Sequence, residues 1–189
     1  KAVDDYLDCI EKSKKQNELQ LLMNPVWHVH NGSVPNEDMI MTFSMLLNLV
    51  ETSNADSKEL LWKFVKKYKP DILEKNFPIF DALVGYAIKY FNDVIKAQKK
   101  YKTPNENEKL ALQSLVNTLE KCNDEMLPED IQTLIYSTGK ENGYVDNLRD
   151  WFKLIYEVVF GDENGPRMGF FISFFGVNET KELLINKLK

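Results

Sequence analysis

Apolar residues recur every three or four positions along almost the whole chain, and this spacing limits its possible folds more than any other feature. In the opening stretch AVDDYLDCIEKSKK, the residues Val3, Tyr6, Leu7 and Ile10 fall on one side of a helix. Short alternating runs rich in Val, Ile and Thr, which are typical of strands, are scarce. The sequence therefore predicts an all-α protein.

The same spacing, with proline and glycine as stop signals, predicts a succession of helices. We expect them at residues 2–22, 37–51, 57–68, 78–100, 103–122, 128–138, 146–160, 166–175 and 178–188. The stretch NPVWHVHNGSVPN between the first two holds two prolines and a glycine and is expected to be a loop. Gly139, Gly161 and Gly176 stand where left-handed residues would end three of the later helices.

The sequence YKTPNENE at residues 101–108 marks a boundary between two helical units. Thr103 and Glu106 have the spacing of a capping box, and Pro104 would occupy the first helical position. No internal repeat of fixed period is visible in the chain. We therefore expect two packed units, residues 1–102 and residues 103–189.

The chain is acidic overall, with a formal net charge of −5, but its charge is unevenly distributed. Residues 58–102 hold eleven lysines and five acidic residues, whereas the rest of the chain is strongly acidic. The overall charge argues against unspecific binding to nucleic acid. The basic stretch is compatible with a surface that faces phosphates and also with ordinary solvated helix faces, and the sequence leaves both interpretations open.

No apolar run is long enough to cross a bilayer, and the charged amino end does not resemble a signal peptide. The two cysteines, Cys9 and Cys122, lie far apart and have no CxxC spacing, which favours a reduced protein. We therefore expect a cytoplasmic protein that does not associate with membranes.

The residue patterns of common catalytic sites are missing from these 189 residues. No P-loop, GxGxxG, GxSxG or HExxH motif occurs. His28 and His30 are the only histidines, and no cysteine or carboxylate cluster with ligand spacing accompanies them, as zinc would require. The sequence predicts no catalytic residue and no metal site, so a binding role is favoured.

Cations and rings stand together in the last quarter of the chain. One expected helix carries Arg149 and Lys153 beside Trp151, and the segment after it carries Arg167 and Phe170. Unstacked bases of single-stranded RNA stack on aromatic and guanidinium planes, while lysines meet the phosphates. The combination therefore suits RNA binding. An ordinary amphipathic helix with Trp151 in the core is the alternative.

Five blocks of sequence appear in a recognisable order: NPVWHVHNG (24–32), FSMLLNLV (43–50), YKTPNENE (101–108), IQTLIY (131–136) and LRDWFKLIYEVVFGDENGPRMGFFISFFG (148–176). Together they closely resemble the carboxyl-terminal part of the class I lysyl-tRNA synthetases. The blocks are long and collinear, and the resemblance covers essentially the whole chain. That family joins lysine to its tRNA with ATP, through an aminoacyl-adenylate.

The resemblance implies a particular architecture and role. A helical stem-contact bundle, residues 1–102, would be followed by an α-helical cage that holds the anticodon, residues 103–189. The HIGH and KMSKS signatures of the family do not occur in this sequence, and HVHNG follows no strand. The resemblance therefore implies the tRNA-binding portion, inactive alone. The full-length enzyme would use ATP and carry a partner catalytic domain on the N-terminal side.

The resemblance also assigns two groups of residues to contacts with the lysine tRNA. One group lies in the basic stretch and would face the RNA backbone: Lys63, Lys66 and Lys67. The other group would meet the unstacked anticodon bases: Arg149, Trp151, Lys153, Arg167 and Phe170. The family usually has a small residue where this chain has Phe170, so we rank Phe170 below Arg167.

The residues themselves leave a different class of function open. A free-standing helical domain could bind another protein without binding RNA, and its lysines would then serve only solubility. Binding to lysine tRNA that weakens when the anticodon is changed would separate the two interpretations.

Overall fold

The computed structural model describes residues 1–53 and 55–189. Within these residues it contains helices, turns and loops and no strand, so the predicted all-α class is confirmed. None of the helices in the described part of the chain is both long enough and apolar enough to span a membrane.

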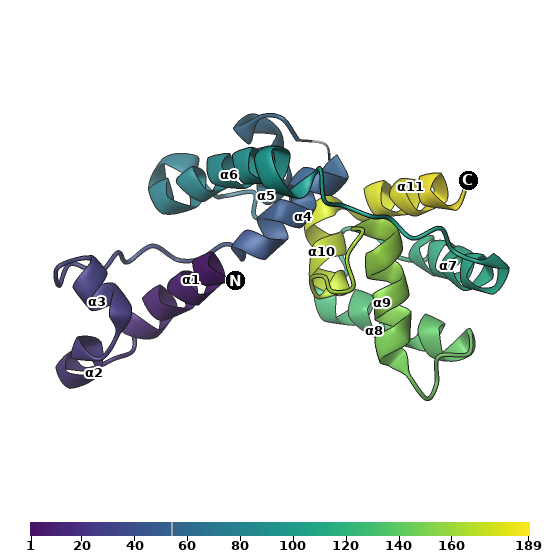
Figure 1. Cartoon of the computed structure of the whole chain (residues 1–189), viewed down its shortest axis with the longest axis horizontal. Coiled ribbons are helices and arrows are strands. Elements are labelled where there is room, and N and C mark those ends of the chain that lie inside the picture. The colour runs from purple at the N-terminus through teal and green to yellow at the C-terminus, as the bar shows by residue number, and fades with distance from the viewer. Residues whose placement is uncertain (54) are drawn as a thin grey trace.

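The first half of the chain forms α1 (Ala2–Ser13), α2 (Glu18–Leu22), α3 (Pro25–Val29), α4 (Phe43–Ser53), α5 (Lys58–Tyr68), the 3-10 turn η1 (Glu74–Asn76), α6 (Pro78–Tyr90) and the π-helical turn η2 (Phe91–Ile95). The second half forms α7 (Glu106–Leu119), α8 (Pro128–Glu141), α9 (Leu148–Val159), α10 (Met168–Phe175) and α11 (Val177–Leu188). The molecule is elongated: α1, α2 and α3 form one end, α7, α8, α9 and α11 form the other, and α4 lies between them (Figure 1).

The structure has two helices, α1 and α2, where the sequence predicted one over residues 2–22. Asn17 starts α2 with a capping box, in which its side chain accepts from the Gln20 N–H and the Gln20 side chain accepts from the Asn17 N–H, both at 3.0 Å. The chain therefore begins a new helix here and does not continue the first one. The expected loop that follows contains the helical turn α3, which the Asn24 side chain caps at the Val26 N–H, at 3.1 Å.

Carboxylates from distant parts of the chain bind the starts of the central helices. Asp4 Oδ1 accepts from the Phe43 N–H at 2.6 Å, and α4 begins at Phe43, later than the expected start at Glu37. Glu37 instead accepts from the N–H groups of Ile79 and Phe80, at 2.8 and 2.7 Å, in the first turn of α6. These bonds satisfy backbone donors that a helix cannot pair internally, and they place negative charge where the helix dipole favours it.

The helix expected over residues 78–100 is shorter, because α6 passes into the π-helical turn η2 and the chain then leaves the helix. The connecting segment runs beside α9, where the Lys102 N–H donates to the Glu157 carbonyl oxygen at 3.1 Å. Asn105 and Glu108 then form the capping box of α7. The sequence predicted this box in the right segment but two residues too early.

The glycines expected to end helices behave differently from one another. Gly139 lies inside α8 and does not end it. A Cβ at Gly139 would lie 2.7 Å from Cγ of Trp151, so the glycine makes room for this ring. Gly161 (φ 57°) and Gly176 (φ 111°) do follow the ends of α9 and α10, in backbone conformations that favour glycine.

One hydrophobic core runs through the described part of the molecule. Helix α10 lies against α8 and also reaches α5 in the first half of the chain. There Phe175 packs on Phe64 and Phe174 packs on Tyr68, with ring centroids 5.5 and 4.1 Å apart. The boundary between residues 102 and 103 stays a prediction, and the two sides of it share this core.

Candidate nucleic-acid interface

Helix α9 turns an apolar face inward and a mixed face outward. Its buried residues are Trp151, Leu154, Ile155, Val158 and Val159. Arg149 is exposed on the opposite side, and Phe152, Lys153 and Tyr156 are partly exposed. The helical spacing of the sequence thus leaves a cation and several ring edges at the surface.

Trp151, which the resemblance assigned to base stacking, is fully buried. Its indole N–H donates to the Ile135 carbonyl oxygen at 3.0 Å, and its ring lies over Gly139 and 5.3 Å from the ring of Tyr144. The stacking role is therefore wrong for Trp151, because the packing of α9 on α8 encloses its ring completely. The structure thus matches the other interpretation of the sequence, an ordinary amphipathic helix with Trp151 in the core.

A row of less buried rings runs beside the buried face. Tyr136 of α8 contacts Phe152 edge-on, with ring centroids 5.0 Å apart, and Phe152 lies 6.2 Å from Tyr156. Tyr136 is 41% exposed, so the row opens to solvent at that end. Burial, with a smaller contribution from nearby Tyr136, raises the pKa of Tyr156 to about 12, so this hydroxyl is neutral at pH 7. Sequence reasoning missed Tyr136, because only the packing of α8 on α9 brings it to this surface.

The loop at residues 161–166 is fastened to α9. The Tyr156 hydroxyl donates to the Pro166 carbonyl oxygen at 2.9 Å. Gly165 lies directly against the Tyr156 ring, since a Cβ there would be 2.7 Å from Cε1. Lys153 Nζ pairs with Glu163 at 2.8 Å, and this hydrogen bond raises the pKa of Lys153. The loop therefore has a defined position beside the outward face of α9.

Arg167 follows this loop and is exposed. Its guanidinium carbon lies 5.5 Å from the centroid of the partly buried Phe170 ring, within the range of a cation–π contact. Helix α10 begins at Met168, two residues after the expected start at Pro166. The phenylalanines beyond Phe170 are buried and hold α10 in the core: Phe171, Phe174 and Phe175.

These contacts connect one surface across α8, α9, the loop and the start of α10, which we call the ring–cation surface: Tyr136, Arg149, Phe152, Lys153, Tyr156, Arg167 and Phe170. Four of its members line a cleft of 340 Å³: Arg149, Phe152, Lys153 and Tyr156. The cleft is completed by two carboxylates and two amides: Asp150, Glu163, Asn147 and Asn164. Arg167 extends the surface past Pro166, to which Tyr156 is hydrogen-bonded. Arg149 lines this cleft and Arg167 lies over Phe170, and these are the only two arginines of the chain.

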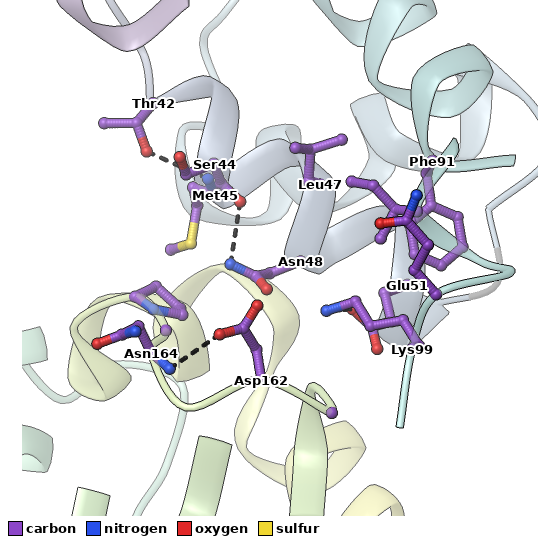
Figure 2. A pocket seen from close by; sticks show the side chains of 15 residues that line it. Thr42, Ser44, Met45, Leu47, Asn48, Glu51, Phe91, Lys99, Asp162 and Asn164 are labelled. Atoms are coloured by element: carbon purple, nitrogen blue, oxygen red, sulfur yellow. Dashed lines mark hydrogen bonds and ion pairs between the residues drawn. The ribbon is translucent and has the colours of Figure 1, made fainter. Parts of the chain in front are cut away.

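The same loop borders a second cleft of 530 Å³, which we call the loop–α4 cleft. Its opposite wall is α4, and η2 and the segment after it close one side (Figure 2). Sequence reasoning did not identify this cleft. Its walls come from segments more than a hundred residues apart, and no motif links them.

The three lysines expected to face RNA are in different electrostatic situations. Lys63 is exposed and forms no ion pair within the part of the chain that the structure describes. Lys66 pairs with Glu74 at 2.6 Å. Lys67 bridges two carboxylates of the second half of the chain, the nearer being Asp124 at 2.9 Å. The positive charge of the basic stretch is thus partly neutralised by neighbouring acids.

The two histidines make ordinary structural contacts. Nε2 of His28 lies 2.7 Å from the Leu22 carbonyl oxygen, and Nε2 of His30 lies 2.7 Å from the Tyr6 hydroxyl. Among the described residues, no group of three or more His, Cys, Asp or Glu side chains is arranged to hold a metal ion.

Comparison with known proteins gives a consistent result along the whole chain. The chain is 41% identical over 184 residues to the lysine–tRNA ligase of Roseobacter denitrificans, in a match that covers 97% of this chain and 34% of the ligase. The lysine–tRNA ligases of Rickettsia felis and Rickettsia bellii are 40% and 39% identical over 190 residues, covering all of this chain and 36% of each ligase. No family model matches the chain, and no solved structure matches it significantly.

These relatives are all tRNA ligases. More particularly, the chain is about 40% identical along its whole length to one part of lysine–tRNA ligases, consistent with a part of such a protein. The chain spans about a third of the length of the curated relatives that it matches.

Proposed function

We propose that this chain is the tRNA-binding, anticodon-recognising part of a class I lysine–tRNA ligase, in which it follows the catalytic domain. The complete ligase would attach lysine to its tRNA with ATP. The similarity to lysine–tRNA ligases supports the parent enzyme. The ring–cation surface supports RNA binding by this part.

The observation that carries the proposal is that each arginine of the chain lies beside a partly exposed ring, Arg149 in a cleft with Phe152 and Arg167 over Phe170. A planar guanidinium can pair with a phosphate through two N–H groups and can also stack on a base, which a lysine ammonium cannot do. The rings available for stacking are Tyr136, Phe152 and Phe170, since Trp151 is buried. Unstacked anticodon bases offer the flat faces that such rings bind.

Filter binding of the chain to lysine tRNA tests this proposal directly. We expect saturable binding that weakens when the anticodon is changed. Arg149→Ala and Arg167→Ala should each weaken binding about five- to a hundredfold, because contacts of this kind contribute about 1–3 kcal/mol. Lys15→Ala, an exposed change on the segment after α1, should stay within about twofold. Equal affinity for both tRNAs would refute anticodon recognition, and absence of binding would favour a protein-interaction domain.

Lys63, Lys66 and Lys67 are proposed to face the RNA backbone. Lys63 is the sharpest probe, because its replacement disturbs no ion pair in the described residues. Lys63→Gln should lower the slope of log affinity against log salt by about 0.7–0.9, the effect of one phosphate contact. An unchanged slope would remove Lys63 from the interface. Lys66 and Lys67 would have to exchange their carboxylate partners for phosphates.

The chain alone is proposed to lack ligase activity, because the HIGH and KMSKS signatures do not occur in its sequence. In an ATP–pyrophosphate exchange assay with lysine, we expect only the background rate. A rate clearly above background would contradict this part of the proposal and leave the RNA-binding part untouched.

A further inference from the structure

The loop–α4 cleft is lined by apolar and polar side chains in similar measure. Met45, Leu47 and Ile95 are among the apolar ones. Asn48 from α4 and Asp162 from the loop point toward one another across the cleft, and Asn164 lies beside Asp162 (Figure 2). A ligand with both apolar surface and polar edges matches this lining. The volume of 530 Å³ falls in the range of sites that enclose small molecules, about 300–1,000 Å³.

Two solvent-accessible hydrogen-bond acceptors of the cleft have no protein donor within the described residues. Asn48 uses its Nδ2 to donate to the Ser44 carbonyl oxygen at 2.9 Å, and its Oδ1 has no partner within the described residues. Asp162 Oδ1 accepts from the Asn164 N–H at 3.1 Å, while Oδ2 has no partner there. The two oxygens come from opposite walls of the cleft. Water can bind both oxygens, and a ligand with N–H donors would replace that water.

The wall that carries Asp162 is held in place before any ligand arrives. Besides its attachments to α9, the loop is fixed at its start: Lys99 Nζ donates to the Phe160 carbonyl oxygen at 2.5 Å. Gly161 lies against the backbone of Lys100, since a Cβ there would be 3.2 Å from the carbonyl carbon. Because the loop is already ordered, a ligand bound against it loses little affinity to ordering the site.

The charges on the two sides of the loop favour different chemical groups. The Asp162 carboxylate disfavours a phosphate in the cleft, and Lys99 is already paired with Glu51 at 3.0 Å. Arg149 and Arg167, by contrast, lie on the ring–cation surface that the loop also borders. Phosphates are therefore expected on the ring–cation surface, and a neutral donor group is expected in the loop–α4 cleft.

We propose that the loop–α4 cleft receives one unstacked nucleobase of the bound RNA. The base lies between α4 and the loop, and an amino or imino N–H of its edge donates to Asp162, with Asn48 as a second polar contact. This inference rests on the proposed RNA-binding function and adds a specific base site to it. Carboxylate and amide side chains are among the groups that proteins use to read base edges.

Two neighbouring carboxylates in the loop allow a test with opposite expected signs. Asp162→Asn keeps an Oδ1 acceptor for the Asn164 N–H and so preserves the loop, but it removes the charged acceptor from the cleft. We expect it to weaken binding of lysine tRNA about five- to tenfold. Glu163→Gln removes an equal charge but releases Lys153 of the ring–cation surface, so it should strengthen binding. Asn48→Ala should weaken binding in the same way as Asp162→Asn.

The opposite expected changes in tRNA affinity distinguish base recognition from general electrostatic repulsion. If carboxylates only repel the RNA, both Asp162→Asn and Glu163→Gln strengthen binding, and the base site is refuted while the proposed function stands. The same conclusion follows if Asp162→Asn leaves the affinity unchanged. If the unaltered chain does not bind lysine tRNA at all, the proposed function fails and the base site fails with it. Equal unfolding midpoints of the variants in urea show that the fold is retained.

Discussion

At the scale of single residues, several glycines are required for space rather than for turns. Gly139 and Gly165 have ordinary backbone angles, yet each lies directly against an aromatic ring of α9. At Gly139 the ring belongs to the buried Trp151, which cannot move aside without disturbing the core. Such glycines let two helices, or a helix and a loop, approach closely.

Gly139→Ala should lower the free energy of unfolding by about 1–3 kcal/mol, because the new methyl group overpacks the Trp151 ring. Urea unfolding followed by circular dichroism measures the change. Gly85→Ala is a matched control in another helix, where the new methyl would meet only the flexible Lys58 side chain, 2.8 Å from Cε. It should be neutral or stabilise the protein by up to about 1 kcal/mol. A Gly139→Ala protein as stable as the parent would show that the ring has room to shift.

At the scale of helices, the starts of α4 and α6 depend on carboxylates far away in the sequence. Asp4 of α1 binds the start of α4, and Glu37 binds the start of α6. Each bond therefore ties two elements together in addition to capping one of them. The arrangement explains why residues 37–42, despite their apolar character, do not extend α4.

Glu37→Ala should cost about 1–2 kcal/mol of stability, the usual effect of losing a helix cap. The expected loss is measured by thermal or urea unfolding. Glu182→Ala serves as the control, because Glu182 is exposed within α11 and makes no hydrogen bond or ion pair in the described residues. This control should stay within about 0.5 kcal/mol. Equal effects of the two changes would mean that the bonds to Ile79 and Phe80 contribute nothing.

At the scale of the whole molecule, a polar cluster around the buried Glu51 carboxylate fastens the connecting segment to both halves. Glu51 of α4 accepts from the Tyr101 hydroxyl and pairs with Lys99, which also donates to the Phe160 carbonyl oxygen. Lys187 of α11 lies 3.3 Å from the centroid of the Tyr101 ring. Because the Glu51 carboxylate is buried, removing its hydrogen-bonding partners is costly. The cluster therefore couples the position of α4 to that of α9 and α11.

Tyr101→Phe tests this coupling through its pH dependence. Burial, and then the hydrogen bond to Glu51, raise the pKa of Tyr101 above its usual value, so the folded state holds the proton more tightly than the unfolded state. The stabilisation is complete below the unfolded pKa of about 10 and is lost as the pH rises towards the folded value. At pH 8 the variant should be about 1–2 kcal/mol less stable than the parent, and the difference should shrink at pH 11.

Urea unfolding at both pH values gives this comparison. Tyr90→Phe is the control, since Tyr90 is exposed and its hydroxyl makes no hydrogen bond in the described residues. It should show little difference at either pH. A Tyr101→Phe deficit that stays constant between pH 8 and pH 11 would contradict the assigned role of the hydroxyl.

The sequence by itself determined the local features. Helical spacing predicted the all-α class, and side-chain patterns placed a capping box in the segment before α7 and the glycine-marked ends of α9 and α10. These features depend on residues within a few positions of one another, so the signal is contained in a short stretch of chain. The same holds for the similarity to lysine–tRNA ligases, which is a property of the residue order.

Only the tertiary structure decided which side chains are available to a ligand. Trp151 and Phe152 are neighbours with the same aromatic signal, yet packing on α8 buries the first and leaves the second partly exposed. Tyr136 lies on the candidate surface and Asp162 faces α4 because segments distant in sequence contact one another. Burial and pairing depend on what lies across the core, and periodicity along one helix carries no information about that.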